Sequence, residues 1–230
     1  MEPTLADRAY HGLRQKLVRG ELQAGQRLVN RVIAKELRVS QTPLREAINR
    51  LVSEGVFEFV PGAGAYVHQI DFQELLQLYD LREHLEPFAA RRAARHITDA
   101  ELLEMEAICA DWRRIARHIR DEGRTSATPD EMLRWNDNEE RFHALLLLAS
   151  RNRWLTAIVG NLRLLAMAFA VQRQNPQMLS LRAAAITWRD HARIVRTLRS
   201  GDEEQAEQMM RRHVAFGRSF VLESLQGQTP

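Results

Sequence analysis

The sequence predicts a mainly α-helical fold in two parts: three short helices with a β-hairpin, and then an all-α bundle of about six helices. Two observations support this division. The hydrophobic period changes from about 3.6 residues to about 2 after Gly55, and becomes helical again from Asp71 onward. Residues 1–68 hold 10 Lys and Arg against 7 Asp and Glu, whereas residues 69–230 hold 23 of each. We therefore expect one domain over residues 1–68 and a second over residues 71–225.

The N-terminal part begins with two short amphipathic helices. Leu13 and Leu17 share the apolar face of the first helix, which Gly20 can end. After a turn, Asn30 is a suitable N-cap for a second helix over residues 31–37.

A third helix follows directly. Ser40 and Thr42 both offer hydroxyl groups to its N-terminus, and Pro43 is compatible only with its first turn. Gly55 stands where a C-terminal cap is expected.

A hairpin completes the first part. Residues 56–60 and 65–68 have the composition of β-strands, and they are joined by the turn sequence PGAG at 61–64. Its glycines can adopt the positive φ angles of a hairpin tip. The order helix, helix, turn, helix, hairpin is that of a winged helix-turn-helix.

The second part has helical patterns throughout. Thr98 with Glu101, and Thr128 with Glu131, have the spacing of a capping box at a helix start. The first helix of this part carries a leucine stripe, Leu75, Leu78, Leu81 and Leu85. Three further helices are expected at residues 153–174, 181–199 and 202–225.

The composition excludes several classes of protein. Cys109 is the only cysteine, so an intramolecular disulfide is excluded, and its apolar neighbours indicate an inert core thiol. The first residues include Glu2 and Asp7 and no apolar run, which argues against a signal peptide. No apolar stretch approaches the roughly 18 residues of a membrane span. We expect a cytoplasmic protein with no membrane partner.

Polar side chains gather around the third helix in the pattern of a DNA-recognition helix. Leu44 and Ile48 repeat at the spacing of a buried face, which directs the polar residues outward. The candidate DNA contacts are Arg31, Ser40, Gln41, Thr42, Arg45 and Arg50. These could instead be solvated residues of an ordinary helical domain, but the glycine-tipped hairpin favours double-stranded DNA as the partner.

Four potential metal ligands are spaced so that they can converge. Glu139 and His143 are four residues apart and share a helix face. His191 lies ten residues before Gly201 and His213 twelve after it, roughly 15 to 18 Å from that turn on antiparallel helices at about 1.5 Å per residue. Each histidine alone is compatible with a core or surface role. Together, three imidazoles and a carboxylate suit a divalent transition metal, Zn or Ni first, with Fe or Mn as alternatives.

The segments around the third helix resemble the GntR family of bacterial regulators. The matching stretches are LVNRVIA at 28–34, VSQTPLREA at 39–47, LVSEG at 51–55 and GAYV at 64–67. The resemblance implies that Arg31, Gln41 and Arg45 contact operator bases or nearby phosphates. It further implies that Ser40 and Thr42 bind the DNA backbone, and that Gly64 forms the tip of the wing.

Two positions depart from the family pattern. The family usually has Glu where Asn30 stands and Arg where Gln41 stands. Arginine matches the two acceptors of guanine, whereas glutamine matches the acceptor and donor of adenine. We therefore expect adenine in the half-site where family operators commonly have guanine.

The second part resembles the FCD effector domain of the FadR branch over about residues 71–225. The matching stretches include YDLREHLE at 79–86, EERFHAL at 139–145 and DHARI at 190–194. The family usually has Asp at the position of Glu139, and Glu140 is a weaker candidate ligand. The resemblance implies that Arg82 addresses an anionic effector, and a metal beside an arginine favours a small carboxylate.

The resemblance implies a ligand-responsive regulator, with repression the expected mode, that binds a palindromic operator as a homodimer and senses a small organic acid beside a metal ion. Two alternatives remain at this point. One is a helical-bundle metalloenzyme, since histidines and carboxylates also serve metal catalysis. The other is a regulator whose metal is purely structural.

Overall fold

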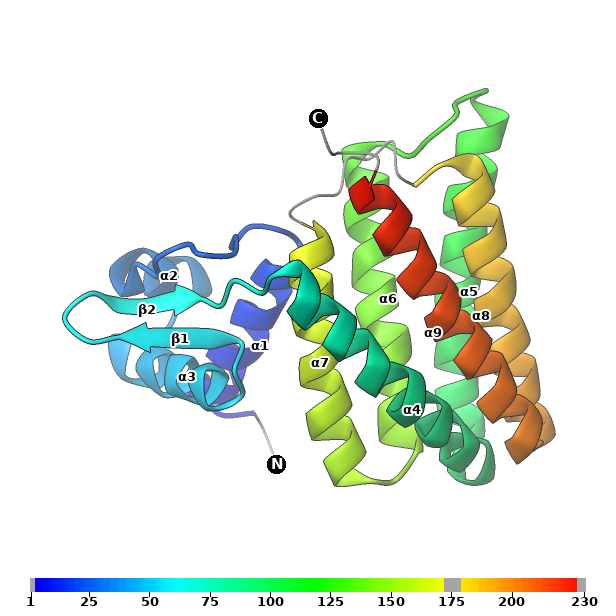
Figure 1. Ribbon diagram of the computed structural model, residues 1–230, viewed down its shortest axis with the longest axis horizontal. Helices are drawn as coiled ribbons and strands as arrows, with labels where there is room; N and C mark the ends of the chain where they lie inside the picture. The colour runs from blue at the N-terminus through cyan, green and yellow to red at the C-terminus, as the bar shows by residue number, and fades with distance from the viewer. Residues whose placement is uncertain (1–2, 172–178, 227–230) are drawn as a thin grey trace. The chain divides into compact units, whose positions relative to one another are not determined.

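The computed structural model describes residues 3–171 and 179–226, and its elements follow the expected order (Figure 1). Within these residues, three helices and a β-hairpin come first and six longer helices follow, so the predicted fold class is confirmed. The chain forms two compact units. One comprises the residues up to 75 together with the segment from 163, and the other comprises residues 76–162 and the chain from 173. The sequence pattern did not indicate that residues from 163 group with the first unit, because the helix that contains them has a continuous apolar pattern.

Three helices and the hairpin build the first unit around an aliphatic core. The elements are α1 (Leu5–Val18), α2 (Asn30–Leu37), α3 (Gln41–Ser53), β1 (Phe57–Val60) and β2 (Gly64–Val67). Leu13 and Leu17 of α1 and Leu44 and Leu51 of α3 are fully buried, because each helix directs its apolar face inward. This packing orients α3 and leaves its other face exposed.

A third segment pairs with the hairpin, which the sequence did not indicate. β1 and β2 pair antiparallel, with Val60 opposite Gly64 at the tip. A segment before α2 adds to the far side of β2, where the Leu28 amide donates to the Ala65 carbonyl at 2.8 Å. This third segment has no strand-like alternation of its own, so nothing in its sequence predicted the pairing.

The start of α2 differs from the expectation. Asn30 is the first helical residue rather than the cap, because the Val29 carbonyl already accepts from the amides of Val32 and Ile33 at 2.9 and 3.1 Å. At α3 the cap is Ser40, as expected, but its side chain makes no capping hydrogen bond.

Gly55 ends α3 in the conformation that the sequence indicated. Its φ is +75°, its amide donates to the Val52 carbonyl at 3.0 Å, and the next amide, Val56, donates to Leu51 at 2.9 Å. These two bonds are those of a Schellman motif, which satisfies the last carbonyls of the helix.

We expect Gly55→Ala to destabilise the N-terminal unit by about 1 kcal/mol, because a Cβ is unfavourable at positive φ. A Cβ at this position would meet no atom within 4 Å, so the cost comes from the backbone conformation alone. Amide hydrogen exchange in α3 measures the effect. Gly217→Ala is the control, since Gly217 lies inside a helix with equal space around it and should stabilise its own unit slightly. Unchanged exchange in α3 of the Gly55 variant would contradict this account.

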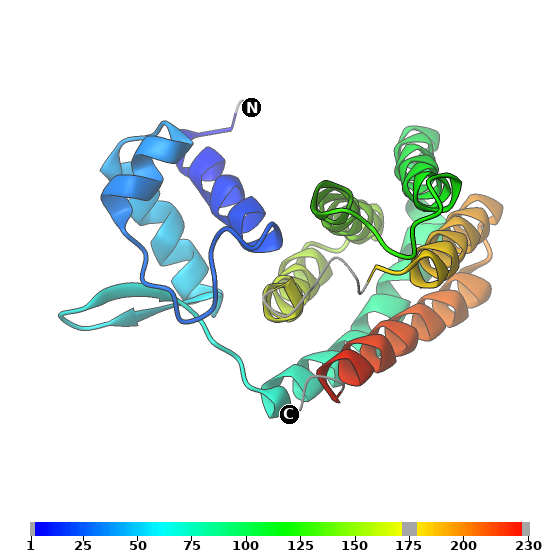
Figure 2. The same ribbon diagram turned by 90° about the horizontal axis from the view of Figure 1, so that it is seen from above.

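The second unit is a bundle of long helices. They are α4 (Phe72–His96), α5 (Asp99–Asp121), α6 (Pro129–Ala149), α7 (Arg153–Val171), α8 (Leu181–Ser200) and α9 (Glu203–Gln226), of which α7 belongs to this unit only up to residue 162. Figure 2 shows α8 lying between α5 and α9, and α8 packs against both. Both predicted capping boxes are present, at the starts of α5 and α6. The end expected for α7 at residue 174 lies outside the described residues.

The leucine stripe of α4 is only partly buried. Leu75 is fully buried, but Leu81 is 50% exposed. The buried face instead continues through Tyr79, Arg82 and Glu86. The leucine stripe did not indicate this face because two of its residues are charged, and an apolar pattern cannot reveal charged side chains that are buried as a pair. Among the described residues, no helix combines the length and the apolar composition that a membrane crossing requires.

Candidate metal centre and nucleic-acid interface

Four side chains from three helices converge in the second unit. Glu139 and His143 come from α6, His191 from α8 and His213 from α9. One ligand atom from each lies within 4.8 Å of all the others. His143 and His191 are 1% and 0% exposed, whereas Glu139 and His213 are half-buried. The structure therefore brings together all four residues whose convergence the spacing indicated, and the cluster could hold a metal ion.

The distances between these atoms fit the donor set of a metal centre. The Nε2 atoms of His143 and His213 are 3.3 Å apart. The Glu139 carboxylate lies 3.7 Å from His143 Nε2 and 3.5 Å from His191 Nε2. Ligands about 2.1 Å from a tetrahedral ion are about 3.4 Å from one another. The side chains could therefore coordinate an ion with only small movements.

Two of the imidazoles have an oxygen acceptor near their other nitrogen. His191 Nδ1 lies 2.9 Å from the Thr187 carbonyl, an acceptor, so Nδ1 carries the proton and Nε2 presents its lone pair to the cluster. His143 Nδ1 lies 3.3 Å from the Glu86 carboxylate, which favours the same tautomer. Contacts of this kind are typical of metal-binding histidines.

Aromatic rings hold His191 in place on its other sides. The Trp112 ring lies 4.1 Å from it, centroid to centroid, and the Phe142 ring meets it edge-on at 4.6 Å. Trp112 and Phe142 are both fully buried. These rings keep water from one side of the cluster and restrict rotation of the imidazole.

Arg82, the predicted effector contact, forms a buried ion pair. Its Nε donates to Glu86 at 2.6 Å, and its guanidinium lies over the Tyr79 ring at 4.6 Å. Burial disfavours the charge on Arg82, but the adjacent Glu86 carboxylate outweighs it and raises the pKa of Arg82 above its ordinary value. Glu86 thus connects Arg82 to His143.

Cys109 is buried, as its neighbours indicated. Desolvation, followed by the negative charges of Glu106 and Glu139, raises the pKa of its thiol to about 12. The thiol is therefore protonated at neutral pH, and a protonated thiol is neither a nucleophile nor a good metal ligand.

The predicted DNA contacts at the start of α3 are on the surface of the first unit. Leu44 and Ile48 are buried, which turns the polar residues of the first turn and a half to solvent. The exposed residues here are Ser40, Gln41, Thr42 and Arg45, and Arg31 at the start of α2 is exposed as well. The buried apolar side chains hold the helix while these polar side chains remain available to a partner.

Arg50 differs from this set. Its guanidinium lies 3.8 Å from the centre of the Tyr10 ring and pairs with Glu54 at 3.2 Å. The Tyr10 contact connects α3 to α1, so Arg50 has a structural role within the unit.

Gly64 is the first residue of β2 and has a φ of +106°. This conformation is unfavourable for residues with a Cβ, so the glycine is required by the geometry of the wing.

Sequence reasoning missed Glu86, Thr187 and Trp112. The only signal for Glu86 was its position four residues after Arg82, the spacing of an ion pair on one helix face. Thr187 contributes a backbone carbonyl, which any residue type could supply. Trp112 looked like an ordinary core residue.

Each of the two parts of the chain matches a known family of protein domains. Residues 5–67 match the family model described as "Bacterial regulatory proteins, gntR family", and residues 77–216 match the FCD domain. The Nta operon transcriptional regulator of Aminobacter aminovorans is 28% identical over 203 residues, which cover 88% of each chain. The transcriptional repressor GlaR of Escherichia coli is 21% identical, over 95% of this chain and 96% of its own.

A solved structure of E. coli McbR/YncC has the same fold, with a TM-score of 0.78 at 18% identity, over 96% of this chain and 99% of that one. The relatives are transcriptional regulators and not enzymes, so the metalloenzyme alternative is set aside. The chain belongs to the gntR family of bacterial regulatory proteins, in the FadR-like branch that carries a C-terminal FCD domain.

Proposed function

We propose that this chain is a homodimeric transcriptional repressor that binds a palindromic operator and responds to a small organic acid beside a divalent metal ion. The observation that carries the proposal is the cluster of Glu139, His143, His191 and His213, with ligand atoms within 4.8 Å of one another. Zn or Ni is our first expectation, with Fe or Mn as alternatives, because three imidazole nitrogens and one carboxylate suit these ions.

The four side chains would hold the ion, and Thr187 and Glu86 would keep two of the imidazoles in the coordinating tautomer. An ion that accepts more than four ligands would supply further coordination positions, to which a carboxylate could attach. A small organic acid fits this chemistry better than a neutral ligand does.

Arg82 would reinforce the preference for an acid. A guanidinium has five N–H donors, and the bond to Glu86 uses the one on Nε. An effector carboxylate could therefore approach the terminal nitrogens while Glu86 keeps its bond. The same ion pair also favours a second candidate function, a regulator whose metal only stabilises the fold, because Glu86 already neutralises Arg82.

On the DNA side, we propose that Ser40 and Thr42 bind the phosphate backbone and that Arg31, Gln41 and Arg45 lie near the bases. Their support is the exposed start of α3 and the glycine-tipped wing beside it. Arg50 is a weaker candidate because Tyr10 and Glu54 already engage it. One DNA-binding unit is small, so we expect two such units, bound to two half-sites, to provide the specificity.

The two functional candidates can be separated by one experiment. The operator is first selected from random duplexes, and its affinity is then measured by gel shift for metal-free and metal-loaded protein, with and without small carboxylates. If the metal takes part in sensing, a small acid changes the affinity of the protein for its operator only when the metal is bound. A purely structural metal raises stability and leaves the acid without effect.

Replacing Gln41 by Arg should move the preferred base of the half-site from adenine to guanine. A bidentate pair discriminates between bases by about 1–3 kcal/mol, or a factor of roughly 5 to 150. Binding selections on random duplexes for the natural protein and the variant measure the change.

Ser53→Ala is the control for this substitution, because Ser53 is an exposed residue at the opposite end of α3 and should leave the preference as it is. Selection of guanine by the natural protein, or the same preference in the Gln41 variant, would contradict the assignment.

A further inference from the structure

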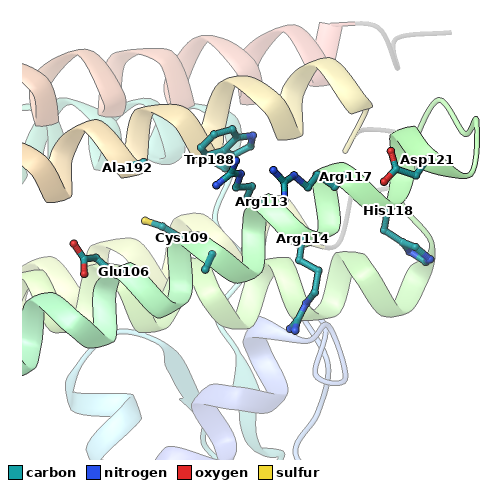
Figure 3. Close-up of a pocket in the computed structure, with 10 residues that line it drawn as sticks. Glu106, Cys109, Arg113, Arg114, Arg117, His118, Asp121, Trp188 and Ala192 are labelled. Carbon is teal, nitrogen blue, oxygen red and sulfur yellow. The ribbon is translucent and has the colours of Figure 1, made fainter.

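A groove between α5 and α8 of the bundle is lined in part by positively charged side chains. Its cavity volume is about 650 Å³. Arg113 and Arg117 enter it from α5, and Trp188 and Ala192 form the side contributed by α8. Figure 3 shows Arg113 and Arg117 reaching toward Trp188, whereas Arg114 points to the other side of α5. The groove lies wholly within the second unit.

The charges in this groove are not balanced. Its acidic residues are neutralised by arginines that do not line it: Glu106 pairs with Arg199 at 2.7 Å and Asp121 with Arg120 at 2.7 Å. Within the part of the chain that the structure describes, neither Arg113 nor Arg117 forms an ion pair. The two are four residues apart on one helix face, so their charges repel each other.

Trp188 adds a flat apolar surface to the charged pair. Its ring is half-buried and lies 5.7 Å from the Arg113 guanidinium. Cys109 and Ala192 extend the apolar part of the lining. A ligand that complements this groove therefore has negative charge for the two guanidiniums and a planar apolar body for the indole.

We propose that the groove between α5 and α8 binds an aromatic organic anion, with Arg113 and Arg117 as the charged contacts and Trp188 as the stacking surface. Guanidinium groups match carboxylates in bidentate geometry, and an anion between them relieves their mutual repulsion. The site is separate from the metal centre in its residues, and it does not depend on the proposed response to an organic acid there.

The test uses the full chain freed of metal, so that no ion at the four-residue cluster can attract the probe. Phthalate, succinate and inorganic phosphate are titrated by calorimetry and by tryptophan fluorescence. We expect saturable binding in the order phthalate, succinate, phosphate, because only phthalate also stacks on the indole. Trp188→Phe should remove most of the fluorescence change.

Replacing both Arg113 and Arg117 by Gln should weaken phthalate binding at least about tenfold, since each charge-assisted contact is lost. Arg114→Gln is the matched control: Arg114 borders the same groove but points to the other side of α5 and pairs with Asp111, so its substitution should leave the affinity unchanged. His213→Ala should also leave it unchanged, which keeps this test distinct from that of the metal centre.

Three results would overturn the proposal: no saturable binding of any probe, equal losses in the Arg114 control and the double variant, or unchanged affinity in the double variant. Sedimentation of the double variant completes the test. A change in assembly mass with unchanged anion affinity would show that these arginines meet a second copy of the chain instead.

Discussion

Replacing His213 by Ala should weaken the binding of a divalent ion at least about a hundredfold. Structural zinc sites bind their ion with a free energy of about 10–16 kcal/mol, which four ligands share. The loss of one ligand therefore costs about 3 kcal/mol of binding free energy. His213 is the best of the three histidines for this test because it is only half-buried, whereas His191 is enclosed by Trp112 and Phe142. Its removal therefore leaves little cavity in the core.

The affinity is measured by competition with a chromophoric chelator. His84→Ala is the control, because His84 is an exposed histidine on α4 outside the cluster. The thermal stability of the metal-free proteins should be similar, which separates ligand loss from misfolding. If the His213 variant binds the ion as tightly as the natural protein does, the four residues do not form the metal centre.

Replacing Glu86 by Gln should weaken metal binding about 10- to 100-fold although Glu86 is not a ligand in the proposed centre. Its carboxylate lies 3.3 Å from His143 Nδ1, where it would favour the coordinating tautomer of that imidazole. Glu83→Gln on the same helix is the control, since Glu83 pairs with Arg218 at 3.2 Å and is not part of the cluster.

The Glu86 variant also leaves Arg82 buried without its counter-charge, which commonly costs about 3–5 kcal/mol. A double variant, Arg82→Met with Glu86→Gln, removes both charges and restores the balance. The free energy of unfolding of each variant and of the natural protein, measured with and without metal, gives the decisive comparison. If the double variant gains as much stability from the metal as the natural protein does, Glu86 stabilises the fold and does not position His143.

The first unit could be predicted from the sequence because its signals are local. Glycines at positive φ, such as Gly55, and an apolar face such as that of Leu44 and Ile48 need no knowledge of distant residues. The start of α2 was misplaced by one residue because the backbone of Val29, and not the side chain of Asn30, makes the first contacts. The strand-like pairing at Leu28 depends on β2, which lies far along the chain.

The candidate metal centre could be predicted in part. The spacing of Glu139 and His143, and of His191 and His213 around Gly201, is regular enough to indicate convergence. The role of Glu86 could not be predicted, because the apolar pattern of α4 favours the leucines, and Leu81 proves to be exposed. Buried charged pairs are stabilised by each other, and only coordinates reveal that they face one another.

We propose that the candidate metal centre and the DNA-binding unit act together as one switch. The most direct test is the affinity of the full chain for its selected operator, measured in metal-free and metal-loaded protein with lactate, succinate or citrate. We predict that an acid changes operator affinity about 5- to 150-fold in the loaded protein, and that the change disappears without metal and in the His213 variant. Equal operator affinity in the metal-free and loaded proteins with every acid would contradict the account.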